Sequence, residues 1–277
     1  MSQLVRLVEE EGWHEAVVME LNRSYSKVLD PFTDNAGTFR AILRATGSVI
    51  SGSTALWYLL RMPDAWTPRD MDIITPYDTF NDMLDYLMSL PAAVLIDEQA
   101  DDYRLLPGYY GRFRVRTSGG YIDILQSRSN TPFTVITGYW STHVMNALTA
   151  DAFWSAYPSL TLQGIGVYNH TPEGGTYTAA VERHRQRGFK ISTGPELEHP
   201  IAIEVNCDNY VACPRRDRYW GDQFTLKVPL AHRSVQALME SMSGTHTACW
   251  RLGTPGCGNS KCLLGSEFRN YCVPWVD

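Results

Sequence analysis

Two acidic residues separated by one apolar residue, Asp70 and Asp72, are the strongest candidates for chemistry in this chain. Residues 70–74 alternate in the manner of a β-strand, which places both carboxylates on one face and Met71 and Ile73 on the other. Two neighbouring carboxylates repel each other unless a cation neutralises them. Mg²⁺ takes oxygen ligands and commonly joins one or two carboxylates to substrate phosphates. The pair therefore predicts a magnesium site, and a solvated strand edge is the alternative.

A short turn, Gly52-Ser53-Thr54, precedes this strand by a helix-length interval and has the composition of a phosphate-binding turn. The apolar residues 48–50 before it have strand character, and small residues then allow a tight turn into a helix. Glycine lets a phosphate approach the backbone, a hydroxyl can donate a hydrogen bond, and the unpaired N–H groups at a helix start favour an anion. An ordinary turn with an N-cap residue is the alternative.

A third acidic residue, Asp123, interrupts a later apolar run. Residues 112–117 alternate as a strand, residues 118–120 read as a tight turn, and residues 121–125 predict a second strand. An aspartate on that strand either faces water or converges on Asp70 and Asp72, because a buried carboxylate without a partner is costly.

These segments together resemble the nucleotidyltransferase superfamily with the DNA polymerase beta-like fold, whose pattern is a Gly-Ser turn, two aspartates on one strand and a third acid on a later strand. Residues 50–56 and 66–72 are also similar to uncharacterised fungal proteins of this type, and the resemblance extends over residues 36–170. It implies that three aspartates are catalytic and hold two Mg²⁺ ions, and that the turn holds the β and γ phosphates of a nucleoside triphosphate; the residues are Asp70, Asp72, Asp123, Gly52, Ser53 and Thr54.

The activity that this resemblance implies is transfer of a nucleoside monophosphate from a nucleoside triphosphate to an unidentified acceptor, with release of pyrophosphate. Two alternatives stay open: a catalytically silent nucleotide-binding module with a regulatory or interaction role, and a terminal nucleotidyltransferase acting on RNA or tRNA. The net charge of −6 argues against a protein that grips long nucleic acid.

The composition predicts a globular protein, since 277 residues with 44% apolar side chains can bury a sizeable core. The first eleven residues are charged, and no stretch reaches the roughly 18 apolar residues of a membrane span. We therefore expect a cytoplasmic protein, with a nuclear location as the alternative, and no membrane partner.

The hydrophobic pattern of the segments around these residues predicts an α/β (α+β) fold, in which helices flank a mixed sheet. Helical patterns cover residues 3–22, 38–45 and 77–90, with Asp34 or Asn35 as the cap of the second, and residues 94–96 predict a short strand. We expect a nucleotidyltransferase-like core over residues 1–170 and a helical, cysteine-containing region over residues 171–277.

All six cysteines follow residue 206. Without a secretion signal they favour a thiolate metal site or buried thiols over disulfides. Four of them are the candidate zinc ligands, with three histidines as additional candidates: Cys207, Cys213, Cys257 and Cys262, then His199, His232 and His246.

Two further polar groups have both a functional and a structural interpretation. Ser141, Thr142 and Asn146 could hydrogen-bond a base or sugar, and His143 could carry a proton, but a cap with a buried, hydrogen-bonded histidine is favoured. A basic helix after residue 175 could bind phosphate, although a solvated face is favoured; its residues are Arg183, His184, Arg185, Arg187 and Lys190.

Overall fold

A computed structural model describes residues 14–61, 66–97, 108–169, 178–192, 211–230 and 248–253. The helices are α2 (His14–Leu29), α3 (Ala36–Thr46), α4 (Gly52–Leu60), α5 (Phe80–Met88), α6 (Phe133–Thr137), α7 (Pro158–Leu162) and α8 (Thr178–Gln186), with a 3₁₀ turn η2 (Thr142–Val144). The strands are β1 (Val49–Ser51), β2 (Asp70–Thr75), β3 (Val94–Asp97), β4 (Tyr109–Thr117), β5 (Gly120–Ser127), β6 (Asn146–Leu148), β7 (Ala152–Ser155), β8 (Ile165–Val167), β9 (Lys190–Ser192), β10 (Arg218–Tyr219), β11 (Leu226–Pro229) and β12 (Cys249–Trp250).

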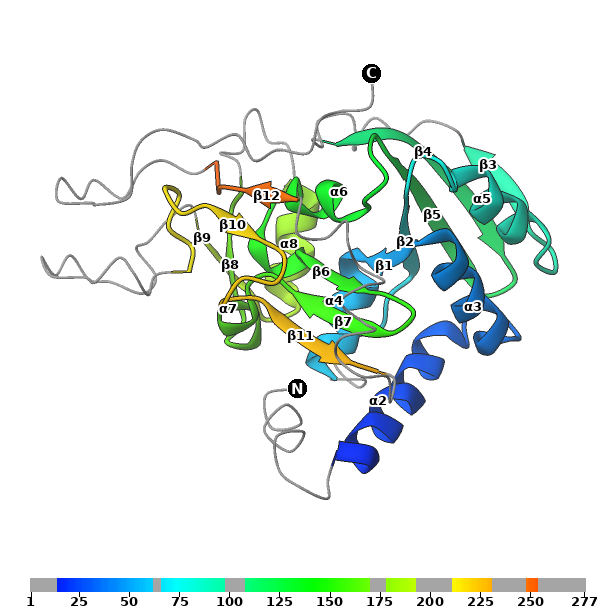
Figure 1. Ribbon diagram of the computed structural model, residues 1–277, viewed down its shortest axis with the longest axis horizontal. Helices are drawn as coiled ribbons and strands as arrows, with labels where there is room; N and C mark the ends of the chain where they lie inside the picture. Colours follow the sequence, from blue (N-terminus) through cyan, green and yellow to red (C-terminus); the bar gives the residue numbers. More distant parts are fainter. Residues whose placement is uncertain are drawn as a thin grey trace, which may run out of the picture.

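A mixed eight-stranded sheet organises these elements, in the order β11-β7-β6-β1-β2-β5-β4-β3 (Figure 1). β2 and β5 run parallel, and the other neighbouring strands of this sheet are antiparallel. The α/β class, with a large mixed sheet flanked by helices, is thus confirmed.

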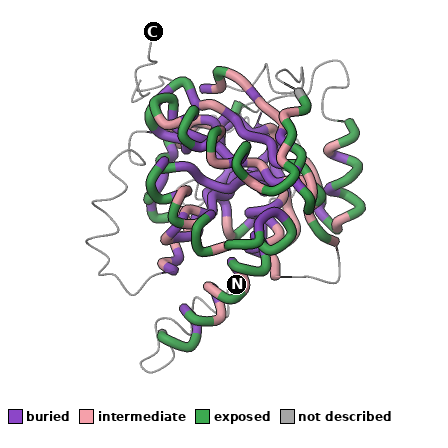
Figure 2. The backbone as a smooth tube through the Cα atoms, turned by 90° about the vertical axis from the view of Figure 1, so that its right-hand side faces the viewer, coloured by how far each residue is buried: buried purple, intermediate pink, exposed green. Residues whose placement is uncertain are grey.

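The two faces of the sheet bury two apolar clusters, because side chains alternate along each strand. Met71 and Ile73 of β2 belong to a cluster that includes residues of α2, α3 and α5. Ile74, on the other face, joins a cluster that contains residues of α6, β7 and β12. Buried segments accordingly run through the middle of the molecule and exposed ones lie on its outside (Figure 2).

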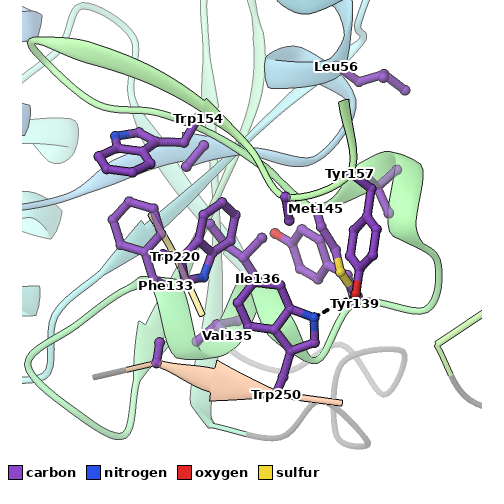
Figure 3. Close-up of a cluster of buried hydrophobic side chains, with 14 of the residues drawn as sticks. Leu56, Phe133, Val135, Ile136, Tyr139, Met145, Trp154, Tyr157, Trp220 and Trp250 are labelled. Atoms are coloured by element: carbon purple, nitrogen blue, oxygen red, sulfur yellow. Dashed lines mark hydrogen bonds between the residues drawn. The ribbon is translucent and has the colours of Figure 1, made fainter. Parts of the chain in front are cut away.

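The aromatic part of the second cluster connects described residues after position 210 to the sheet (Figure 3). Trp220 packs edge-on against Phe133, with ring centroids 4.8 Å apart. The Trp250 Nε1–H donates a hydrogen bond of 2.9 Å to the Tyr157 hydroxyl. β11 also pairs with β7, so described residues on both sides of position 170 share one sheet and one core. The division into two regions near that position stays a prediction.

Local sequence signals account for several element ends. The Asn35 side chain caps α3 by accepting a hydrogen bond of 2.9 Å from the Thr38 N–H, as predicted. Gly47 ends this helix with a left-handed φ of 65°. α5 begins at Phe80, three residues later than the pattern predicts, with Thr79 at the N-cap position. The described part of the chain contains no helix long and apolar enough to cross a membrane.

Candidate functional site

The turn between β1 and α4 lies directly against Asp72. Ser51 pairs with Asp72 across the antiparallel strands β1 and β2, and the next residue, Gly52, has a left-handed φ of 59°. A Cβ atom on Gly52 would lie 2.0 Å from Oδ2 of Asp72, well inside van der Waals contact. The carboxylate therefore packs onto the backbone at the start of α4, and only glycine leaves room for it.

The two other residues of this turn have different surroundings. Thr54 is fully buried, and its hydroxyl donates a hydrogen bond of 2.9 Å to the backbone carbonyl of Asp70. This bond fixes the start of α4 to the start of β2. Ser53 is half-buried. Thr54 thus positions the turn, and phosphate binding by Gly52, Ser53 and Thr54 stays a prediction.

The three aspartates lie on two adjacent strands. Asp70 and Asp72 share one face of β2 while Met71 and Ile73 are completely buried on the other, as the alternation predicts. Asp72 is directly opposite Asp123 in the parallel pair of β2 and β5. The Asp70 side chain is 38% exposed, whereas the Asp123 side chain is 1% exposed.

Two arginines of β4 hold Asp123. The sequence predicted instead that this residue either faces water or converges on Asp70 and Asp72. Arg114 donates to both carboxylate oxygens, from Nε to Oδ1 and from Nη2 to Oδ2, each at 2.7 Å. Arg112, only 6% exposed, adds a third hydrogen bond of 2.8 Å to Oδ1. The partners that a buried carboxylate requires are therefore guanidinium groups. Arg114 also reaches within 3.9 Å of Asp70.

The donor set decides which metal these residues can hold. In the described residues, no group of three or more His, Cys, Asp or Glu side chains is placed to hold a metal ion. The carboxylates of Asp70 and Asp72, on one face beside the glycine turn, have the oxygen donors that suit a Mg²⁺ ion, which commonly completes its ligands with phosphate oxygens and water. Asp123 has three guanidinium hydrogen bonds in this conformation, so it is not part of that donor set.

The predicted zinc site falls mostly outside the described residues. Cys213 is buried in the second apolar cluster, beside Val211 and Ala212. Three of the four candidate thiols and all three candidate histidines lie outside the described ranges: Cys207, Cys257, Cys262, His199, His232 and His246. Zinc binding stays a prediction.

A tyrosine that the sequence did not indicate lies within electrostatic reach of Asp72. Tyr139, in the loop after α6, is almost fully buried. Burial raises the pKa of its hydroxyl, the nearby charge of Asp72 raises it further, and a hydrogen bond with Ser51 opposes both effects. Tyr139 therefore stays a neutral hydroxyl beside the Asp72 carboxylate.

Arg187 stacks on Trp66 and lies within electrostatic reach of Asp70. The Arg187 guanidinium carbon is 3.9 Å from the centre of the Trp66 ring. Burial lowers the pKa of Arg187, and Arg183 lowers it further, while attraction to Asp70 raises it. Arg187 of the predicted basic segment thus lies near Asp70. Neither Arg187 nor Lys190 is in the helix, because α8 ends at Gln186 and Lys190 begins β9.

The polar patch at residues 141–146 is a structural network. His143 is fully buried between Ser141 Oγ, 2.9 Å from its Nδ1, and His184 Nδ1, 2.9 Å from its Nε2. The Thr142 hydroxyl accepts from the Val167 N–H at 3.0 Å. Asn146 Nδ2 donates to the His143 carbonyl at 2.7 Å. The predicted buried and hydrogen-bonded histidine is confirmed, but the predicted cap is not, because Ser141 makes no side-chain cap hydrogen bond to η2. The partner of His143 on α8 was not predicted.

Burial of this histidine pair keeps both rings neutral. Desolvation lowers the pKa of His143 far below its ordinary value, and the charges of His184 and Arg187 act in the same direction. Desolvation, followed by Arg187 and Arg183, lowers the pKa of His184 to about 3.

Comparison with known proteins adds nothing to this geometry, since no family model, curated protein or solved structure matches the chain.

Proposed function

We propose that the protein binds a nucleoside triphosphate with Mg²⁺ at Gly52, Ser53, Asp70 and Asp72, and transfers its nucleoside monophosphate group to an acceptor. One observation carries the proposal: the left-handed glycine turn at the start of α4 packs directly on Asp72, so a phosphate site and a pair of carboxylates adjoin. Neither feature alone is specific, but a magnesium triphosphate needs both at once.

The binding step uses groups with distinct tasks. The free N–H groups at the start of α4 and the Ser53 hydroxyl bind phosphate oxygens. Asp70 and Asp72 hold the ion, which when bound neutralises phosphate charge and polarises the P–O bonds. Arg187, drawn toward Asp70 and stacked on Trp66, adds positive charge beside the same carboxylate.

The transfer step places the acceptor on the β5 side of the bound triphosphate. An acceptor oxygen attacks the α-phosphorus, and a new P–O bond forms as the bond to the bridging oxygen of pyrophosphate breaks. The acceptor's proton is released to solvent. Arg114, near both Asp70 and Asp123, is placed to stabilise negative charge on the transferring group.

A second candidate function is nucleotide binding without transfer. It is favoured by the three hydrogen bonds that Asp123 accepts from Arg112 and Arg114. Two-metal transfer places a second ion on such a carboxylate, and here the guanidinium groups already neutralise it.

The experiment compares wild-type protein with Asp72→Asn and with the control Asp82→Asn, an exposed aspartate on α5. Calorimetry measures nucleoside triphosphate affinity with Mg²⁺ and with chelator. A coupled assay measures pyrophosphate release with small-molecule acceptor pools. We expect Mg²⁺-dependent binding that Asp72→Asn weakens and Asp82→Asn preserves. Equal affinity with Mg²⁺ and with chelator would refute the site. Binding without pyrophosphate release from any acceptor pool would favour the second candidate.

A further inference from the structure

Arg187, the residue that follows α8, has a guanidinium group that is stacked on a ring but not hydrogen-bonded. One face of the group lies over Trp66, with the guanidinium carbon 3.9 Å from the ring centre. Among the residues that the structure describes, this half-buried side chain forms no hydrogen bond and no ion pair. The stack therefore restrains the plane of the group while its N–H donors stay available to a ligand.

Arg187 and Asp70 attract each other, but in the described chain they do not form an ion pair. Burial lowers the pKa of Arg187, and the attraction of Asp70 opposes this effect. Trp66 is four residues before Asp70, so the stack lies close to the start of β2. A Mg²⁺ ion on Asp70 would bind phosphate oxygens, and a phosphate on that ion needs a positive partner of its own. Arg187 can supply that partner.

A closed turn fixes the backbone on both sides of Arg187. The Arg187 N–H donates to the Arg183 carbonyl at 3.2 Å. The Phe189 N–H donates to the His184 carbonyl at 3.0 Å. The rings of His184 and Phe189 are both buried, with centroids 4.5 Å and 4.4 Å from that of His143. The turn that contains Arg187 is thus anchored at both ends on one buried histidine.

The hydrogen bonds of His143 have a defined direction. The Ser141 hydroxyl has one proton, which it donates to the Val167 carbonyl at 3.0 Å. The hydroxyl oxygen must therefore accept from His143 Nδ1 at 2.9 Å, which leaves Nε2 of the neutral ring as an acceptor. His184 Nδ1–H then donates to this Nε2 at 2.9 Å. This chain of bonds fixes α8 to η2 three residues before Arg187.

We propose that Arg187 binds a phosphate group of the magnesium triphosphate, and that His143 and His184 are positioning residues that hold Arg187 in place for this contact. The identity of the ligand rests on the proposed function. The physical reason for the positioning is entropic, because an arginine already held by a ring and a closed turn loses less conformational freedom on binding than a mobile one.

The first test uses inorganic tripolyphosphate with Mg²⁺ as the probe, because it has the phosphate chain without a base or sugar. Calorimetry measures its affinity for wild-type protein, for Arg187→Gln and for the control Arg185→Gln, which removes an exposed arginine from α8. We expect Arg185→Gln to bind as wild type does and Arg187→Gln to bind about tenfold or more weakly, since a charge-assisted contact is lost. Equal affinity in Arg187→Gln and wild type would overturn the phosphate contact. A loss seen with ATP but not with tripolyphosphate would also overturn it.

Two substitutions of His184 test the positioning role. The side-chain amide nitrogen of asparagine takes the place of Nδ1, so His184→Asn retains the donor to His143, whereas the longer His184→Gln does not. We expect His184→Asn to retain most of the affinity. His184→Gln should weaken probe binding about threefold or more in the wild-type background and have no further effect in Arg187→Gln, because the two residues act as one unit. An equal fold-loss in both backgrounds would overturn the positioning role, since a general loss of structure acts in both.

Two controls distinguish failure of the Arg187 contact from failure of the nucleotide site. If wild-type protein does not bind the probe, or binds it equally with Mg²⁺ and with chelator, both proposals are refuted. Mg²⁺-dependent binding that Asp72→Asn weakens and Arg187→Gln leaves unchanged would refute the Arg187 contact alone.

Discussion

Replacing Gly52 by alanine tests the contact on which the proposed nucleotide site depends. Gly47→Ala is a matched control, because Gly47 has nearly the same left-handed φ, 65° against 59°. The nearest atom to a Cβ at Gly47 is the Cγ of Pro76, at an ordinary 3.5 Å. The two substitutions therefore impose a similar backbone strain, and only Gly52→Ala forces a neighbouring side chain to move.

The two variants should lose different amounts of unfolding free energy. A left-handed conformation costs a non-glycine residue about 1–2 kcal/mol, and both variants should lose about that much unfolding free energy. At Gly52 the new Cβ would also lie 2.0 Å from Oδ2 and 3.0 Å from Cγ of Asp72. The carboxylate must rotate out of its preferred rotamer, which costs about 0.5–1.5 kcal/mol more.

The functional consequence follows from the displaced carboxylate. Because Asp72 would no longer face the magnesium triphosphate in the same orientation, we expect Gly52→Ala to bind it about tenfold or more weakly, a loss of roughly 1.4 kcal/mol. Gly47→Ala should retain wild-type affinity. Urea denaturation measures the stability of each variant and calorimetry its affinity. Equal destabilisation by the two substitutions, together with unchanged nucleotide affinity in Gly52→Ala, would refute this reasoning.

Two further predictions concern buried charges. The neutral pair of His143 and His184 should make stability fall in acid, because the unfolded chain takes up protons near pH 6.5 while folded His184 does so only near pH 3. This contribution to the free energy of unfolding is fully present above about pH 6.5, and at pH 5 the protonation of His184 in the unfolded chain should remove about 2 kcal/mol of it. Urea denaturation at several pH values measures this loss, and the pH dependence should be flatter in His184→Gln. Asp222→Ala should cost about 3–5 kcal/mol, since it leaves the 1%-exposed Arg218 without its counter-charge; a loss under about 1 kcal/mol would contradict this.

The sequence was informative wherever the signal was local. The period of two placed Asp70 and Asp72 on one face of β2, and Asn35 was one of two predicted caps for α3. The sequence of the β4–β5 hairpin also specifies one ion pair. Its tight turn pairs Thr117 with Gly120, and counting back from that pair places Arg114 opposite Asp123. The pairing of Arg114 with Asp123 therefore follows from the turn alone, whereas Arg112, which is opposite Leu125, does not.

Contacts between distant segments could not be predicted in this way. His143 and His184 are 41 positions apart, and their hydrogen bond depends on how α8 packs against η2. Trp66 and Arg187 come from the connection before β2 and from the residue just after α8. No period or turn specifies such pairs, because each depends on the packing of whole elements.

The ion pairs of Asp123 also determine which acidic residue can report on catalysis. Asp123→Asn would remove the negative charge that balances Arg112, which is almost fully buried, and breaking a buried pair costs about 3–5 kcal/mol. Lost turnover in that variant would therefore combine lost folding with lost chemistry. Asp72 is half-buried, whereas Asp123 is 1% exposed, so the amide introduced by Asp72→Asn stays closer to solvent. A defect in Asp72→Asn is consequently the more direct evidence for a metal at this site, and Asp123 is informative only when the stability of the variant is measured alongside its turnover.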